Sequence, residues 1–137
     1  MKYIKLFEEK VFKQEFKKDD LIVSESFYKD DVFLVLKDAN ENDEKVETFF
    51  IGYFDKHKLD KKFEITFNVD FANKWSKRNY QLRILTEQEK ELIIDEIEND
   101  YANKYLDIIK NKTGIDLKKL PELKEWKRNK SIKNYSL

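Results

Sequence analysis

The sequence contains no cysteine, a single histidine, two glycines and one proline in 137 residues. Without cysteine the chain has no disulfide, no thiolate zinc site and no cysteine nucleophile. The single histidine, His57, lies in a charged segment that lacks the glycine-flanked turn of an exposed catalytic nucleophile. Two isolated glycines do not make a glycine-rich loop around a phosphate group. We therefore expect a protein that is not an enzyme and that holds no metal and no cofactor.

Long apolar runs are also missing. The chain has no stretch of about 18 apolar residues, so the sequence predicts no membrane-spanning helix. Its first residues lack the apolar core and the small-residue cleavage site of a secretory signal. We therefore expect a cytoplasmic protein that does not associate with a membrane. Charged residues make up 41% and apolar residues 40% of the chain, and because the two kinds alternate, a single folded domain is favoured over disorder.

A two-residue alternation of apolar and polar side chains marks two strands. It runs through residues 63–69 and again through residues 80–84, where Tyr80, Leu82 and Ile84 are the apolar positions. Because successive side chains of a strand point to opposite faces, these apolar residues are expected to face inward. Less regular apolar segments predict further strands over residues 3–7, 21–27, 32–36 and 46–54.

Two positions in this part of the chain carry separate predictions. Gly52 interrupts the strand over residues 46–54, which indicates a bulge or a close approach of another backbone segment. Residues 10–16 fit a strand as well as a helix, because Phe12 and Phe16 are compatible with both periods.

A helix is predicted to begin directly after this sheet. Thr86 and Glu89 have the spacing of a capping box, in which each side chain binds the other residue's backbone N–H. Gly114 suits the left-handed residue that ends a helix. Between them, apolar residues recur at three- and four-residue intervals in one stripe: Ile94, Ile97, Tyr101, Tyr105 and Ile108. The pattern predicts one long amphipathic helix over residues 87–112.

These signals together predict an α+β fold. An antiparallel sheet of about six or seven strands occupies residues 3–85, followed by the long helix and by a short C-terminal helix near Pro121. Residues 1–114 are expected to form the sheet-plus-helix part. Residues 115–137 are expected to carry the short helix and a basic tail of the same domain. Such a fold does not by itself indicate a function.

The charges are balanced overall but unevenly distributed. Residues 86–117 contain four basic and nine acidic side chains, whereas residues 118–137 contain seven basic and two acidic ones. The acids near the start of the predicted long helix are favourable for its dipole. The basic end remains as a region that would steer an acidic partner.

Two clusters combine aromatic and basic residues. The first consists of Trp75, Lys77, Arg78 and Arg83, and the second of Trp126, Lys127 and Arg128. Stacking rings beside phosphate-binding cations are typical of proteins that bind single-stranded nucleic acid. The same residue types dominate the energetics of protein interfaces. A structural role is the favoured alternative, in which Trp75 closes one end of the core and Trp126 packs against the sheet.

We expect a small non-catalytic module that binds a host protein and inhibits it. The alternative is a nucleic-acid-binding module that uses the basic-aromatic residues, although the neutral net charge disfavours a dedicated duplex reader. A third hypothesis is an enzyme or a small-ligand carrier whose site is assembled from scattered residues that line a pocket between sheet and helix.

Residues 1–9, Met-Lys-Tyr-Ile-Lys-Leu-Phe-Glu-Glu, resemble the lead segment of many small proteins of large tailed phages. The resemblance implies an origin in a phage or another mobile element. Composition points the same way, because the chain has 25 lysines but 3 arginines and is rich in residues with A/T-rich codons.

Overall fold

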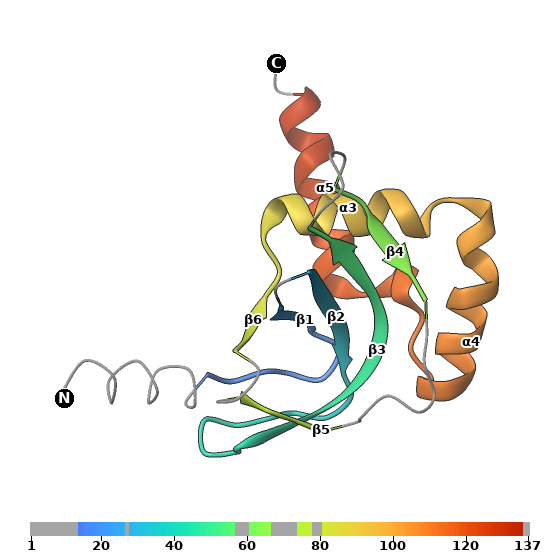
Figure 1. Cartoon of the computed structure of the whole chain (residues 1–137). Coiled ribbons are helices and arrows are strands. Elements are labelled where there is room, and N and C mark those ends of the chain that lie inside the picture. The colour runs from blue at the N-terminus through green and yellow to red at the C-terminus, as the bar shows by residue number, and fades with distance from the viewer. Residues whose placement is uncertain (1–13, 27, 57–60, 67–73, 78–80, 136–137) are drawn as a thin grey trace.

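The computed structural model describes residues 14–26, 28–56, 61–66, 74–77 and 81–135 (Figure 1). Within them, six strands form an antiparallel sheet in which β4, β3, β2, β1 and β6 lie side by side in that order. The short strand β5 pairs with the beginning of β3, at the end of β3 opposite to β4. The strands are β1 (Leu21–Glu25), β2 (Lys29–Val35), β3 (Lys45–Asp55), β4 (Phe63–Ile65), β5 (Lys74–Ser76) and β6 (Leu82–Ile84).

Strand β3 is the longest strand, and it curves through the sheet (Figure 1). Val32 pairs with Gly52 whereas Phe33 pairs with Phe50, so β3 carries one extra residue at this point. A Cβ atom on Gly52 would lie 2.3 Å from the backbone oxygen of Glu64 on β4. Both the predicted bulge and the predicted close approach at Gly52 are therefore confirmed.

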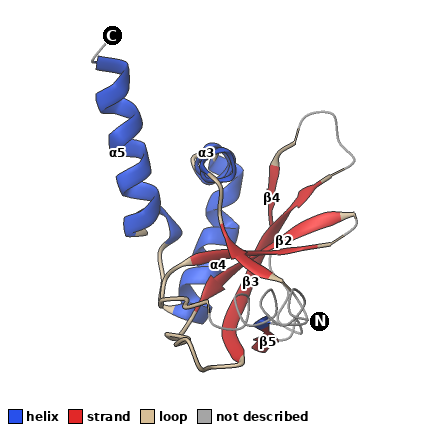
Figure 2. Cartoon of the chain, turned by 90° about the vertical axis from the view of Figure 1, so that its left-hand side faces the viewer, coloured by secondary structure: helices blue, strands red, loops and turns tan. Residues whose placement is uncertain are grey.

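The helices follow the sheet and lie on one side of it (Figure 2). They are α3 (Glu87–Ile97), the 3₁₀ turn η1 (Asp100–Ala102), α4 (Asn103–Thr113), the 3₁₀ turn η2 (Leu117–Lys119) and α5 (Pro121–Tyr135). The predicted α+β class, with an antiparallel sheet followed by helices, is confirmed. The C-terminal helix α5 has 15 residues, and its C-terminal part extends away from the rest of the molecule (Figures 1 and 2).

The predicted helix boundaries are confirmed, but the predicted continuity is wrong. Thr86 Oγ1 accepts from the Glu89 backbone N–H at 3.2 Å, and the Thr86 N–H donates to the Glu89 carboxylate at 2.9 Å. Gly114 ends α4 with a φ of 76°. Between these ends the helix stops at Ile97 and restarts after η1, because Asn99 adopts an extended conformation.

The break changes which residues of the predicted stripe are buried. Ile94 and Ile97 face the core, whereas Tyr101 is 57% exposed. From the last residue of η1 onward the buried positions are Ala102, Leu106 and Ile109, each one residue later than the predicted Tyr101, Tyr105 and Ile108. The extended residue Asn99 interrupts the helical rotation, so the apolar stripe resumes one residue later than in a continuous helix.

Both faces of the sheet are covered by apolar side chains. We call the cluster between the sheet and the helices the helix-side core, and the cluster on the opposite face the far-side core. Strand β1 supplies both, since Leu21 and Val23 join the helix-side core and Ile22 joins the far-side core. The far-side core also includes Phe16, which forms an isolated antiparallel bridge with Ala39.

Some strand predictions differ from the structure or lie outside the described residues. Ile84 was expected to face inward but is 56% exposed, while the neighbouring Leu85 is buried. The chain leaves β6 after Ile84 and turns into α3, so the two-residue alternation ends there. The expected strand over residues 3–7, residues 10–13, the end of the alternation at residues 67–69 and Tyr80 lie outside the described residues.

Candidate functional site

The described members of the first predicted cluster do not form a common binding surface. Trp75 on β5 packs on Phe33 with ring centroids 4.9 Å apart and is partly buried against the far-side core. Lys77 is completely buried, and its ammonium group donates to the backbone oxygen of Asn40 at 2.7 Å. Burial lowers the pKa of Lys77. Both residues support the fold, which corrects the expectation that Lys77 faces a ligand. Arg78 lies outside the described residues.

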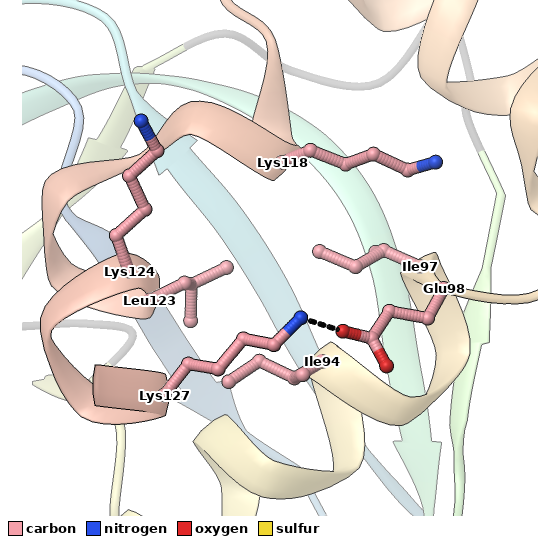
Figure 3. Close-up of a pocket in the computed structure, with 7 residues that line it drawn as sticks. All are labelled: Ile94, Ile97, Glu98, Lys118, Leu123, Lys124 and Lys127. Carbon is pink, nitrogen blue, oxygen red and sulfur yellow. Dashed lines mark hydrogen bonds and ion pairs between the residues drawn. The ribbon is translucent and has the colours of Figure 1, made fainter. Parts of the chain in front are cut away.

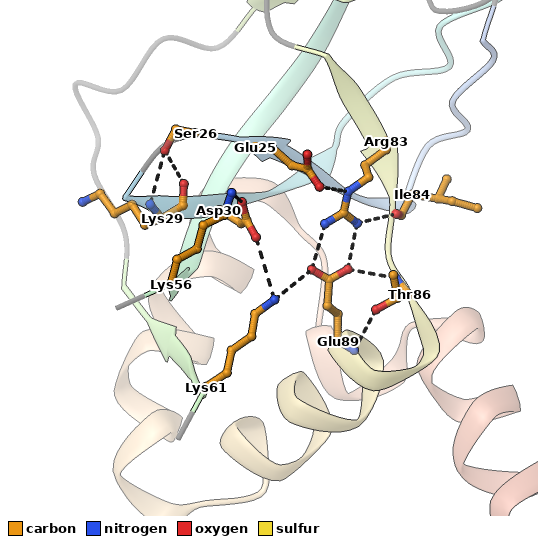
Figure 4. Close-up of polar contacts among 10 residues, drawn as sticks. All are labelled: Glu25, Ser26, Lys29, Asp30, Lys56, Lys61, Arg83, Ile84, Thr86 and Glu89. Carbon is orange, nitrogen blue, oxygen red and sulfur yellow. Dashed lines mark hydrogen bonds and ion pairs between the residues drawn. The ribbon is translucent and has the colours of Figure 1, made fainter. Parts of the chain in front are cut away.

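Arg83, the remaining member of that cluster, is held by two carboxylates (Figure 4). Its guanidinium donates to Glu89 with two bonds of 2.8 and 3.0 Å and to Glu25 at 2.7 Å. Burial raises the pKa of Glu89, but the hydrogen bonds from Arg83 and Thr86 outweigh it, so the pKa is lowered overall. The hydrogen bond with Glu89 raises the pKa of Arg83.

A second buried carboxylate, that of Asp30, continues this network. Asp30 is 2% exposed, and Lys56 approaches it to 3.0 Å. Lys61 lies 3.8 Å from Asp30 and 3.8 Å from Glu89, so it connects the two buried acids. The network of Glu25, Asp30, Glu89, Lys56, Lys61 and Arg83 contains three acids and three bases (Figure 4). We therefore assign it to stability, because it offers no excess charge to a ligand.

The second predicted cluster lies on α5. Trp126 is partly buried and packs against the helix-side core. Lys127 is exposed and forms an ion pair with Glu98 at the end of α3, and Arg128 is exposed. The apolar side of this part of α5 is therefore used for packing, and its basic residues face solvent.

A groove lies between α3 and α5 beside Lys127. Its volume is about 220 Å³, and it is lined by Ile94, Ile97, Glu98, Lys118, Leu123, Lys124 and Lys127 (Figure 3). Ile94, Ile97 and Leu123 make an apolar floor that is continuous with the helix-side core. We call these seven residues the basic groove.

Two ion pairs connect α5 to α3 next to the groove. Lys90 lies 3.4 Å from Glu122 at the first turn of α5, and Lys127 reaches across the groove to Glu98 (Figure 3). The ammonium group of Lys118 donates to Asn103 at 3.2 Å. With three lysines and one glutamate, the lining carries an excess of positive charge.

Of the residues of the basic groove, the sequence predicted only Lys127 as a binding residue, and it placed Ile94 and Ile97 in the apolar stripe of the helix. The signal for Lys124 was present, because Lys124 and Lys127 are three residues apart on a helix and project from neighbouring positions. Lys118 and Glu98 come from separate segments, and only the packing of η2 and α5 on α3 brings them to the same groove.

A second hollow of about the same volume differs in chemistry. It is lined by Lys37, Asp38, Ala39, Asp43, Lys45, Glu47 and Lys74, so three lysines are offset by three acids. It also lacks an apolar floor beyond Ala39. The basic groove is therefore the better candidate for recognition, since it combines unbalanced charge with apolar surface.

The comparisons give no relative from which a site could be transferred: no family model, no curated protein and no solved structure matches the chain. In the described part of the chain, no three acidic or histidine side chains are grouped so that they could hold a metal ion. No described helix is both long enough and apolar enough to cross a membrane.

Proposed function

We propose that this protein is a non-catalytic binding module that docks an acidic segment of another protein in the basic groove. The observation that carries the proposal is the placement of Lys118, Lys124 and Lys127 around an apolar floor. We place the protein in the cytoplasm of a host cell, as a phage or mobile-element product that inhibits the host protein it binds.

The chemistry of the groove defines the expected ligand. Carboxylates would approach the lysine ammonium groups, which also steer an acidic partner before contact. An aliphatic side chain between the carboxylates would cover the floor of Ile94, Ile97 and Leu123 and contribute about 1.5–3 kcal/mol if fully buried. The site is small, so the groove alone supports a transient interaction rather than an obligate one.

A peptide suits the basic groove better than a nucleic acid. Single-strand binders need aromatic faces on which bases stack. The groove has an aliphatic floor, and the two candidate rings, Trp75 and Trp126, are engaged in core packing. Glu98 would also repel a phosphate backbone that entered the groove.

The proposal is tested with a short amidated peptide that has one central leucine between pairs of glutamates. Its addition should shift the backbone NMR signals of residues 94–98 and 117–128. The double variant Lys124→Glu, Lys127→Glu should lose affinity at least tenfold, because two attractions become repulsions. Binding should weaken as salt is added.

A matched control reverses the same two charges elsewhere. Lys110 and Lys112 are exposed on α4 and do not line the groove. The double variant Lys110→Glu, Lys112→Glu should bind the peptide with nearly wild-type affinity. Equal losses in both double variants would show a non-specific charge effect and would count against the proposal. If a single-stranded oligonucleotide binds at the same residues more tightly than the peptide does, the nucleic-acid hypothesis would replace this proposal.

A further inference from the structure

We infer that Glu98 is a built-in competitor of the ligand of the basic groove. Its carboxylate takes the place on Lys127 that a carboxylate of the partner would occupy, so an incoming segment must displace it. This inference rests on the proposed function and deepens it, since it assigns one residue that limits affinity and selects the partner.

The position of Glu98 in α3 supports a role outside the helix itself. Glu98 is the C-cap of α3, where the dipole of the helix disfavours a negative charge. The last turn of α3 contains no basic residue that would compensate for it. The helix end therefore gives no reason for an acid at this position, whereas Lys127 does.

The ion pair is built so that it can be exchanged. The side chains of Glu98 and Lys127 are 48% and 63% exposed, and such surface pairs stabilise a fold by little. The backbone of Glu98 is fixed by hydrogen bonds from its N–H to Ile94 and Glu96. Its side chain is therefore free to turn to solvent while the helix end stays in place.

The groove does not depend on this pair for its shape. Lys90 and Glu122 form a less exposed ion pair between the same helices, with side chains 18% and 26% exposed. Leu123 and Trp126 also anchor α5 in the helix-side core. Loss of the Glu98 carboxylate should therefore leave the groove intact.

Competition by Glu98 also narrows the class of partner. A single carboxylate that replaces Glu98 on Lys127 brings little net electrostatic gain, because one ion pair is exchanged for another. A segment with two or more carboxylates gains additional contacts with Lys118 or Lys124. The partner is thus a polyacidic protein segment with an aliphatic residue among its acids.

The test measures the affinity of the amidated glutamate–leucine peptide for Glu98→Gln by fluorescence anisotropy. Removing the competitor should tighten binding about two- to fivefold, the effect of an ion pair of surface strength. Asp95→Asn is the control, because it removes the same charge from an exposed position of α3 that does not line the groove. That variant should change affinity less than twofold. In the background Lys127→Gln, the gain from Glu98→Gln should disappear.

The outcomes separate this inference from the proposed function. If the wild type binds the peptide and Glu98→Gln binds it equally well or more weakly, the inference is overturned but the proposed function is not. Weaker binding would show that the ion pair of Glu98 and Lys127 stabilises the groove. No binding by the wild type or by any variant would overturn both. Binding by Glu98→Gln without measurable binding by the wild type would support both. Thermal unfolding of each variant checks that the fold is retained.

Discussion

The guanidinium of Arg83 and the carboxylate of Glu89 are joined by two hydrogen bonds of 2.8 and 3.0 Å. The same carboxylate accepts the Thr86 backbone N–H at 2.9 Å, so Glu89 completes the capping box of α3 and also fixes the helix to β6. Glu89 is 2% exposed, so its carboxylate depends on these partners inside the protein. The pair of Arg83 and Glu89 therefore fixes the start of α3 against β6.

Replacement of Arg83 by alanine should lower the free energy of unfolding by about 2–3 kcal/mol, because a buried carboxylate loses its main partner while Lys61 remains 3.8 Å away. The pKa of Glu89 is lowered in the folded state, so its stabilising effect is present above the unfolded pKa and is lost as the pH falls through the folded pKa. The difference from wild type should therefore shrink in acid. Urea unfolding at several pH values measures it.

Glu25→Gln is the control for this prediction. The carboxylate of Glu25 also binds Arg83, but its side chain is 47% exposed. The variant should therefore lower the free energy of unfolding by at most about 1 kcal/mol. If Arg83→Ala is as mild as Glu25→Gln, the pair with Glu89 does not hold the helix to the sheet. In that case Arg83 would again be available as a binding residue.

The two glycines should respond very differently to alanine. At Gly52 a Cβ atom would meet the Glu64 backbone oxygen at 2.3 Å and the Phe63 ring at 2.5 Å, so β4 would have to move. Gly52→Ala should cost more than about 3 kcal/mol of unfolding free energy. At Gly114 there is open space, and Gly114→Ala should cost about 1 kcal/mol for the positive φ alone. Similar melting temperatures for the two variants would contradict the close approach of β3 and β4.

At Lys77, removal of the charge should lower the free energy of unfolding less than removal of side-chain volume. Lys77→Met keeps an unbranched apolar stem beside Phe16 and should cost about 1 kcal/mol, for the lost hydrogen bond to Asn40. Lys77→Ala also leaves a cavity in a fully buried site and should cost at least about 2 kcal/mol. Chemical denaturation of both variants gives the comparison. If Lys77→Met were less stable than Lys77→Ala, the ammonium group of Lys77, and not its aliphatic chain, would hold the loop before β3.

The sheet and the helix ends were predictable because their signals are local. The alternation at Phe63 and Ile65, the capping pair of Thr86 and Glu89, and the cap at Gly114 each depend on neighbours a few residues away. The helix break was missed because apolar spacing continues across it. The only local sign was the run Glu98, Asn99 and Asp100, whose last two residues are poor helix formers.

The site was harder to predict because it depends on contacts between distant segments. Lys77 and Arg83 looked like surface cations, and only the fold shows that Asn40, Glu25 and Glu89 engage them. The basic groove joins α3, η2 and α5, which the sequence places in separate elements. No spacing within one segment encodes such a juxtaposition.

Glu96 gives a prediction with a defined dependence on pH. Burial raises the pKa of its carboxyl above the ordinary value of 4.5, and nearby Glu64 adds to the rise, although the Ile65 N–H, Asn99 and Lys62 oppose it. Since the folded state favours the protonated form, the cost of ionising Glu96 is absent below the unfolded pKa and complete above the folded pKa. Glu96→Gln keeps an acceptor for the Ile65 N–H and removes that cost. It should therefore raise the melting temperature at neutral pH but leave it unchanged near pH ~3.

Asp95→Asn makes the same charge change at the adjacent, exposed position of α3. Its effect on the melting temperature should be small at both pH values, because substitutions of exposed side chains usually change stability by less than about 0.5 kcal/mol. A Glu96→Gln variant that melts below the wild type at neutral pH would show that the ionised carboxylate stabilises the contact between α3 and β4. The Ile65 N–H, 3.4 Å from that carboxylate, would then bind an ionised acid strongly enough to outweigh its burial.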